Sequence, residues 1–255
     1  MNLGFLRFCA AGALLAGLSP FFIGNTLAQE TAPSPSVEVS SVTTRERVVA
    51  LTFDDGPHAT FTPRLLDVLK AHGVKATFFV IGMNVEQNPD VLRRIAAEGH
   101  EIGNHTWSHP NLAKLPEEAW RAQLQQTNDV IVRTIGAPPR IVRPPYGDIT
   151  PEQEENIGRD FHYRVVLWSV DPDDWMEPLR PILLRRVFTH AEPGSIVLLH
   201  DIHASTVDAM PALIEGLQKR GLRFVTVSEL LALESPPQPP ATAAAAQPPP
   251  QRVVP

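Results

Sequence analysis

Short apolar runs alternate with amphipathic stretches along residues 45–234, an order typical of strands that are each followed by a helix. Seven runs are predicted to be strands, at 47–53, 75–81, 100–104, 140–143, 164–168, 195–199 and 222–227. Helices are predicted at 63–72, 89–98, 116–135, 151–159, 180–190 and 206–220. The alternation indicates an α/β fold with a mostly parallel sheet covered by helices. Seven strands fit a closed or nearly closed barrel as well as an open sheet.

Several predicted helix ends carry residues that favour a boundary. A capping residue followed by proline satisfies a free amide and presets the first helical dihedral. Such pairs occur at Thr62-Pro63, Asn88-Pro89 and Thr150-Pro151, and glycines stand at the expected helix ends, at Gly73, Gly99, Gly136 and Gly221.

The two ends of the chain differ in composition from residues 45–234. Residues 1–28 hold an apolar run that ends in small residues, so they are predicted to be a signal peptide cleaved after Ala28; an uncleaved membrane anchor is the alternative. Residues 29–44 are predicted to be a disordered tether, and residues 235–255 a disordered tail rich in proline and alanine. The single cysteine, Cys9, lies in the signal segment, so the exported protein is expected to have no disulfide.

Unusual polar residues follow five of the predicted strands directly. Parallel strands place their carboxyl ends on one face of the sheet, where active sites assemble. We therefore expect these residues to meet in one site. They are Asp54 and Asp55 after the first strand, His105 and His109 after the third, Arg143 to Tyr146 after the fourth, Asp171 and Asp174 after the fifth, and His200 after the sixth.

Asp55, His105 and His109 are predicted to bind one divalent metal ion. Two histidines four residues apart can reach a single ion, although such pairs alone are more often surface or capping residues. Adding Asp55 gives three ligands and leaves a position for water, as in catalytic zinc sites. Neighbouring strand residues point to opposite faces, so Asp54 and Asp55 can share a site only if the strand ends there. Gly56 and Pro57 are expected to permit this, and Asp54 is then free to take a proton.

The remaining motifs supply candidate acid, anchoring and wall residues. Arg143 is predicted to hold Asp54, and the Tyr146 amide, on a proline-stiffened turn, to donate to an oxyanion. His200 is the candidate general acid, with Asp171 beside it raising its pKa. Trp175 is read either as a pocket wall or as core filling. His58 and His203 are expected to play no direct chemical part.

Five motifs in this order resemble the NodB-type polysaccharide deacetylases, carbohydrate esterase family 4: T-F-D-D-G-P, H-T-W-S-H, R-P-P-Y-G, D-P-D-D-W and L-L-H-D-I-H. The resemblance covers residues 47–234 and implies a distorted (β/α) barrel of about seven parallel strands. It implies a divalent metal, most often Zn²⁺ with Co²⁺, Mn²⁺ or Ni²⁺ as alternatives, on Asp55, His105 and His109. It also implies Asp54 as base and His200 as acid. It implies that Arg143 orients Asp54, that Asp171 tunes His200, and that the Tyr146 amide helps the metal to hold the oxyanion. Trp175 and Leu198 would line a pocket for the acetyl methyl group.

The expected function is metal-dependent hydrolysis of N-acetyl groups on a glycan, either peptidoglycan or a chitin-like polymer. The alternatives are an O-acetyl esterase of the xylan type and an inactive glycan-binding protein. The formal charge of −6, without a block of Lys or Arg, argues against nucleic acid as a partner. Export to the periplasm or the cell exterior is expected, without stable membrane insertion once the signal is cleaved.

Overall fold

Residues 38–235 are described in the computed structural model, and they fall within one compact unit of the chain. All strand pairs are parallel. The strands follow the order β1-β6-β5-β4-β3-β2-β7, and β8 pairs with the start of β2. They are β1 (Glu38–Val39), β2 (Val48–Asp54), β3 (Thr77–Val80), β4 (Glu101–Asn104), β5 (Ile141–Val142), β6 (Arg164–Val166), β7 (Ile196–His200) and β8 (Arg223–Phe224).

Backbone hydrogen bonds of the residues that follow β6 join the two edges of this sheet. Val170 forms a parallel bridge with Val197 of β7, and the Leu198 amide donates to the Val170 carbonyl at 2.9 Å. Since β6 pairs with β5, the hydrogen-bonded path runs from β7 through β2, β3, β4, β5 and β6 and returns to β7. The fold is therefore a distorted barrel, a choice that the sequence pattern had left open.

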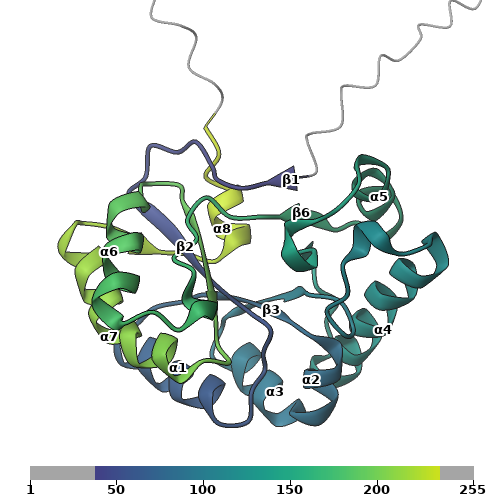
Figure 1. Cartoon of the computed structure of the whole chain (residues 1–255), viewed down its shortest axis with the longest axis horizontal. Helices are drawn as coiled ribbons and strands as arrows, with labels where there is room; N and C mark the ends of the chain where they lie inside the picture. The colour runs from purple at the N-terminus through teal and green to yellow at the C-terminus, as the bar shows by residue number, and fades with distance from the viewer. Residues whose placement is uncertain (1–37, 236–255) are drawn as a thin grey trace, which may run out of the picture. The chain divides into compact units, whose positions relative to one another are not determined.

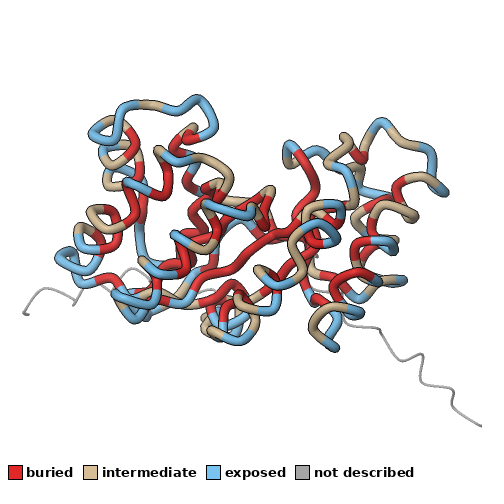
Figure 2. Tube along the Cα trace, turned by 90° about the horizontal axis from the view of Figure 1, so that it is seen from below, coloured by how far each residue is buried: buried red, intermediate tan, exposed pale blue. Residues whose placement is uncertain are grey.

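Helices surround the strands, and β2 and β3 cross the middle of the domain (Figure 1). Every residue of β2 is buried, because the strand lies in the interior of the sheet and is covered on both sides. Buried positions follow the strands and one side of the helices, whereas exposed positions lie on the other side of the helices and on loops (Figure 2). The helices are α1 (Phe61–Ala71), α2 (Gly82–Gln87), α3 (Pro89–Ala97), α4 (Glu117–Ile135), α5 (Pro151–Asn156), α6 (Arg180–His190), α7 (Ala204–Lys219) and α8 (Val227–Leu231).

All seven predicted strands and six predicted helices are present, and several boundary predictions are confirmed. Thr150 forms a capping box with Gln153 at the start of α5. Gly136 ends α4 with φ 77°, a conformation that glycine adopts without a steric penalty. The prediction that Thr62 caps a helix was wrong. The helix α1 already begins at Phe61, and the Thr62 hydroxyl donates to the buried carboxylate of Asp201 instead.

The stretch predicted to be a tether contributes to the fold. Residues 38–44 were wrongly assigned to it, because Val39 and Val42 are buried and β1 pairs with β6. Val39 and Val42 stand three positions apart, so they do not show the two-residue alternation of a strand. The predicted signal peptide, residues 29–37 of the tether and residues 236–255 of the tail lie outside the described residues. Within residues 38–235, the structure contains no helix with the length and apolar character needed to span a bilayer.

Candidate metal-dependent active site

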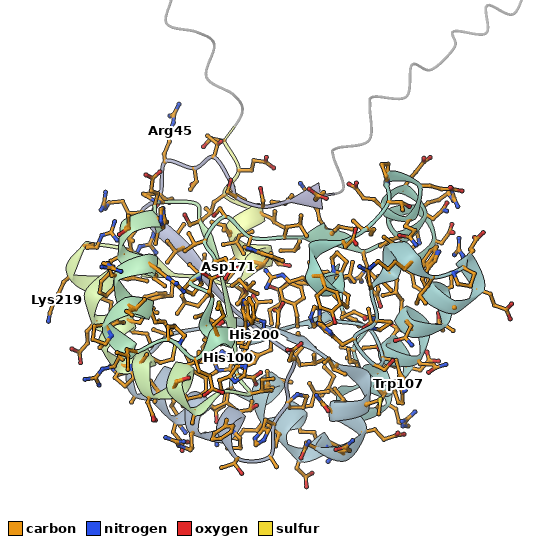
Figure 3. All side chains as sticks on the ribbon, viewed as in Figure 1. Arg45, His100, Trp107, Asp171, His200 and Lys219 are labelled. Atoms are coloured by element: carbon orange, nitrogen blue, oxygen red, sulfur yellow. The ribbon has the colours of Figure 1, made fainter. Side chains whose placement is uncertain are left out.

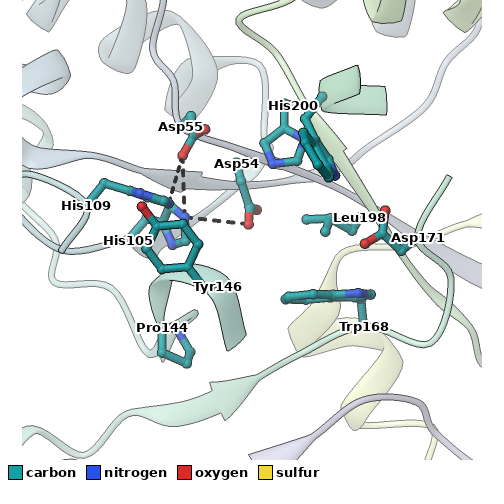
Figure 4. Close-up of a pocket in the computed structure, with 11 residues that line it drawn as sticks. Asp54, Asp55, His105, His109, Pro144, Tyr146, Trp168, Asp171, Leu198 and His200 are labelled. Atoms are coloured by element: carbon teal, nitrogen blue, oxygen red, sulfur yellow. Dashed lines mark ion pairs between the residues drawn. The ribbon is translucent and has the colours of Figure 1, made fainter. Parts of the chain in front are cut away.

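Most of the polar residues predicted at the strand ends line one cavity of about 410 Å³, whereas Arg143 and Asp174 are buried next to it. In β2 and β7, Asp54 and His200 are paired partners, so the parallel register brings these two strand ends to the same level. Figure 3 shows Asp171 and His200 near the middle of the domain, whereas Arg45 and Lys219 point outward at its edge. The cavity is lined by Asp54, Asp55, His105, His109, Pro144, Tyr146, Trp168, Asp171, Trp175, Leu198 and His200 (Figure 4).

Asp55, His105 and His109 are arranged as ligands of one ion. The Oδ1 atom of Asp55 lies 3.5 Å from Nε2 of His105 and 3.4 Å from Nε2 of His109. These distances exceed the usual N–H···O range. They match the separation of two atoms that each lie about 2.0–2.1 Å from a tetrahedral Zn²⁺, which is roughly 3.4 Å. The Asp55 Oδ1 is also buried without a hydrogen-bond partner in the protein. A cation would satisfy this oxygen, so the donor set fits a divalent metal.

Hydrogen bonds, burial and neighbouring charges act on the protonation of these three side chains. Nδ1 of His105 lies 2.7 Å from the Arg143 carbonyl. A carbonyl only accepts, so this nitrogen carries a proton and Nε2 is the nitrogen that faces Asp55. Burial lowers the pKa of His105, but the nearby carboxylates of Asp54 and Asp55 raise it above its ordinary value. Burial, followed by the charge of His105, lowers the pKa of His109, which favours its neutral form. Burial raises the pKa of Asp55, but His105, His109 and His200 lower it to about 2.

The backbone at Asp55 turns its carboxylate toward the histidines. Asp55 has φ 74°, a left-handed conformation that is uncommon for residues other than glycine. The side chain of Asn84 donates to the Asp55 carbonyl at 2.7 Å and helps to hold this conformation. The interpretation that Gly56 supplies the unusual backbone was wrong, because the positive φ belongs to Asp55. Gly56 is needed for space, since a Cβ atom there would overlap the carboxyl group of Asp201.

Arg143 is buried next to the cavity and holds Asp54 in place. Its guanidinium is fully buried and donates to Asp54 Oδ1 at 2.7 Å and to the Thr52 hydroxyl at 2.8 Å. The same group donates to the carbonyls of Val166 and Leu167. These bonds use the fixed fork of arginine, so Asp54 is held in one orientation. The geometry agrees with the contact predicted from the sequence.

His200 is bound by Asp174, and the prediction that Asp171 fills this place was wrong. Nδ1 of His200 lies 2.7 Å from Asp174 Oδ1, and the His200 amide donates to Asp174 Oδ2 at 2.8 Å. The Thr206 hydroxyl also donates to Asp174 Oδ2, at 2.7 Å. Burial lowers the pKa of His200, but the hydrogen bond and charge of Asp174, with Asp54 and Asp55, raise it to about 9. Asp174 is fully buried, whereas Asp171 lies on the cavity wall and binds the Asp173 amide at 2.8 Å.

Comparison with known proteins agrees with this arrangement. The family model described as polysaccharide deacetylase matches residues 41–166. A peptidoglycan-N-acetylglucosamine deacetylase from Bacillus cereus is 44% identical over 186 residues, which cover 71% of this chain and 67% of that protein. The chain belongs to the polysaccharide deacetylase family.

Two further relatives of this polysaccharide deacetylase carry peptidoglycan in their names. The peptidoglycan-N-acetylmuramic acid deacetylase PdaC from Bacillus subtilis is 41% identical over 190 residues, but the match spans only 40% of that protein and 74% of this chain. The crystal structure of a peptidoglycan N-acetylglucosamine deacetylase bound to an N-oxidanyl-benzamide has a TM-score of 0.74 and 40% identity. That match covers 78% of this chain and 96% of the solved one.

The walls of the deacetylase cavity are largely apolar. Leu198 is buried, while Trp175 is 55% exposed and therefore does not fill the core. Tyr146 has φ 63°, and its ring meets that of His109 with centroids 4.8 Å apart. Trp168, which sequence reasoning placed only in a strand, also lines the cavity. Its ring lies 5.6 Å from the Arg143 guanidinium, a tertiary contact that the sequence pattern does not signal.

His58 and His203 are not among the residues that line the cavity. Nδ1 of His58 accepts hydrogen bonds from the amides of Thr60 and Phe61 at the start of α1. His203 precedes α7 and lies 3.4 Å from the Glu177 carboxylate. Both contacts give these histidines structural roles among the described residues.

Proposed function

We propose that this protein removes N-acetyl groups from a peptidoglycan glycan strand by hydrolysis, releasing acetate and leaving an amine. One observation carries the proposal. The cavity brings together three side chains that could hold a metal ion, a carboxylate held by an arginine and a histidine held by a carboxylate. Figure 4 draws Asp54 between the histidine pair and His200. Peptidoglycan is favoured because the relatives named above carry it in their names.

Asp54 is the proposed general base. A divalent cation on Asp55, His105 and His109 would lower the pKa of a water molecule and polarise the substrate carbonyl. Asp54 stands beside this site, with its Oδ2 3.7 Å from Nε2 of His105. Arg143 occupies Oδ1, so Oδ2 is the oxygen that takes the proton from the attacking water.

His200 is the proposed general acid. An amide nitrogen is a poor leaving group unless it receives a proton as the carbon–nitrogen bond breaks. The raised pKa of His200, about 9, keeps the imidazole protonated at neutral pH. Nδ1 is committed to Asp174, so Nε2 delivers the proton to the departing nitrogen. An ester releases its alcohol more easily, so this protonated histidine favours N-deacetylation over the xylan-type alternative.

The other cavity residues are proposed to orient the substrate. The backbone amide of Tyr146 would donate to the oxyanion formed by attack on the carbonyl. Trp175 and Leu198 would enclose the acetyl methyl group, because both present apolar surface to the cavity. Asp171 would bind the sugar and not His200, because a carboxylate on the cavity wall can accept hydrogen bonds from hydroxyl groups.

The identity of the metal and the location of the protein complete the proposal. Zn²⁺ is favoured over Co²⁺, Mn²⁺ or Ni²⁺ because two imidazoles and one carboxylate form a typical catalytic zinc set. We propose that residues 1–28 direct export, so that the enzyme meets its polymer in the periplasm or outside the cell. The peptidoglycan names of the relatives support this location.

The test is acetate release from three defined glycans: peptidoglycan, chitooligosaccharide and acetylated xylan. We expect release from peptidoglycan, and mass spectrometry of the digested product should show loss of acetyl from its amino sugars. The same digest separates glucosamine from muramic acid as the site of reaction. Asp54→Asn is the inactive control. Binding to peptidoglycan without acetate release, at full metal content, would refute the proposal and revive the inactive glycan-binding alternative.

A further inference from the structure

Asp201 is a buried carboxylic acid that the proposed reaction does not use. It follows His200 but does not line the cavity, and its exposed fraction is 0%. One oxygen accepts a hydrogen bond from the Thr62 hydroxyl, while Oδ1 has no hydrogen-bond partner in the protein. Burial, followed by the nearby charge of Asp55, raises the pKa of Asp201 to about 7. Burying such a group is unfavourable, so a compensating role is expected.

The carboxyl group of Asp201 packs directly against Gly56, the residue after Asp55. A Cβ atom at Gly56 would overlap both Asp201 oxygens. The opposite side of this loop is also fixed, since Asn84 binds the Asp55 carbonyl at 2.7 Å and the Ile81 amide binds the Gly56 carbonyl at 2.9 Å. The peptide that follows Asp55 is therefore held between Asp201 and the residues that follow β3.

This restraint acts where the backbone is strained. A left-handed conformation such as that of Asp55, φ 74°, is unfavourable in a residue other than glycine and persists only when its surroundings enforce it. Thr62 extends the restraint, because its hydroxyl donates to Asp201 and accepts from the His58 amide at 2.7 Å. Asp201 thus contacts the loop at Gly56 and, through Thr62, at His58.

We propose that Asp201 is a positioning residue for the metal ligand Asp55. Its carboxyl group supports Gly56 from behind and keeps Oδ1 of Asp55 directed toward Nε2 of His105 and His109. The role requires both the volume of the carboxyl group and its bond to Thr62. This inference rests on the proposed metal site, but it is a separate statement about what shapes that site.

The test measures Zn²⁺ affinity of the metal-free enzyme by competition with a chromophoric chelator, together with the absorption spectrum of bound Co²⁺. Asp201→Ala is expected to weaken Zn²⁺ binding about 10–100-fold, the usual effect of removing a group that supports a ligand. Asp201→Asn keeps the shape and an acceptor for Thr62, so it should restore most of the affinity and the wild-type Co²⁺ spectrum. Thr62→Val should weaken binding in the same direction as Asp201→Ala.

Gly56→Ala provides a direct probe of the packing contact. Gly56 does not have a positive φ, and the three atoms nearest to an alanine Cβ there all belong to the Asp201 carboxyl, so Gly56→Ala should weaken Zn²⁺ binding. In the double variant with Asp201→Ala, the three atoms that would overlap the added methyl group are absent. Its affinity should therefore be no lower than that of Asp201→Ala alone, a non-additive result expected only of groups in contact.

The control is Glu101→Gln, which alters a carboxylate at the opposite end of the barrel. Glu101 accepts from Thr77 and Ser228, so its loss should reduce thermal stability without changing Zn²⁺ affinity. Wild-type affinity in both Asp201→Ala and Thr62→Val, or additive effects of Gly56→Ala and Asp201→Ala, would overturn the inference and leave the proposed function standing. If Asp201→Ala does not fold, Thr62→Val and Gly56→Ala decide. Absence of Zn²⁺ binding by the wild type would overturn both proposals.

Discussion

Replacing Asp174 by asparagine tests which carboxylate controls the general acid. The change removes the negative charge that lies 2.7 Å from Nδ1 of His200. Asp174 supplies the two largest influences that raise the pKa of His200 from 6.5 to about 9. At 1.36 kcal/mol per pH unit, that rise corresponds to about 3 kcal/mol in favour of the protonated imidazole. Loss of a neighbouring opposite charge lowers a pKa by about 1–3 units, so the basic limb should move down by that amount.

The activity should fall most at high pH. If the pKa of His200 drops by about 2 units, from about 9 to about 7, its protonated fraction at pH 8 falls about tenfold, whereas at pH 6 it hardly changes. The assay is kcat/KM for acetate release between pH 5.5 and 10. Asp171→Asn is the matched control, because it removes a cavity carboxylate that does not bind His200, and its basic limb should stay in place. Thr206→Val should also leave the limb in place, since it removes one bond to Asp174 without removing the charge.

The stability of the metal-free protein should depend on pH through the pair of His200 and Asp174. The pKa of His200 is higher in the folded state, about 9, than its ordinary value of 6.5. The folded protein therefore binds the proton more tightly, so this stabilisation is complete below pH 6.5 and is lost as pH rises through 9. In Asp174→Asn, the free energy of unfolding measured by urea denaturation should therefore fall less as pH rises from 6.5 to 9. An unchanged basic limb in Asp174→Asn, or an equal shift in Asp171→Asn, would refute this account of the acid.

Three further predictions concern the base, the metal and the buried arginine. Asp54→Asn should lower kcat at least ~10²-fold while metal content by elemental analysis stays stoichiometric, since the base is lost and the ligands remain; near wild-type turnover would contradict the assignment. Zn²⁺ at about 100 times its Kd should stabilise the protein by about 2.7 kcal/mol, raising Tm by roughly 5–10 °C in calorimetry, and His105→Ala should abolish this rise. Arg143→Lys should reduce the free energy of unfolding by at least about 2 kcal/mol, measured in urea. Lysine cannot reach all the acceptors that the guanidinium binds, and wild-type stability in this variant would show that those bonds are not needed.

Periodicity and strand ends predicted most of the fold and of the candidate site. The buried strands read as apolar runs, and the carboxyl ends of parallel strands must share one face. That rule alone brought Asp54, Asp55, His105, His109 and His200 to one cavity, as the structure confirms. Two short helices, α2 and α8, and the two-residue strand β1 were missed, because segments this short contain too little periodic signal.

Only the tertiary structure shows which of several neighbouring residues makes a given contact. Asp171 and Asp174 lie in one short loop, and nothing in the motif distinguishes them. Only the path of the chain after β6 buries Asp174 against His200 and leaves Asp171 on the cavity wall. Thr62 shows the same limit, because its local sequence predicts a helix cap while the distant Asp201 takes its hydroxyl.

The amino-acid sequence by itself determined the order of elements, the parallel sheet and the chemical groups gathered at its carboxyl edge. These follow from residue spacing along a single chain, since strand and helix periods are local properties. The tertiary structure decided how the barrel is completed through Val170 and Val197, which carboxylate binds His200, and why Gly56 must lack a side chain. Each of these depends on a contact between residues more than 20 positions apart, whose partners are fixed only when the whole core packs.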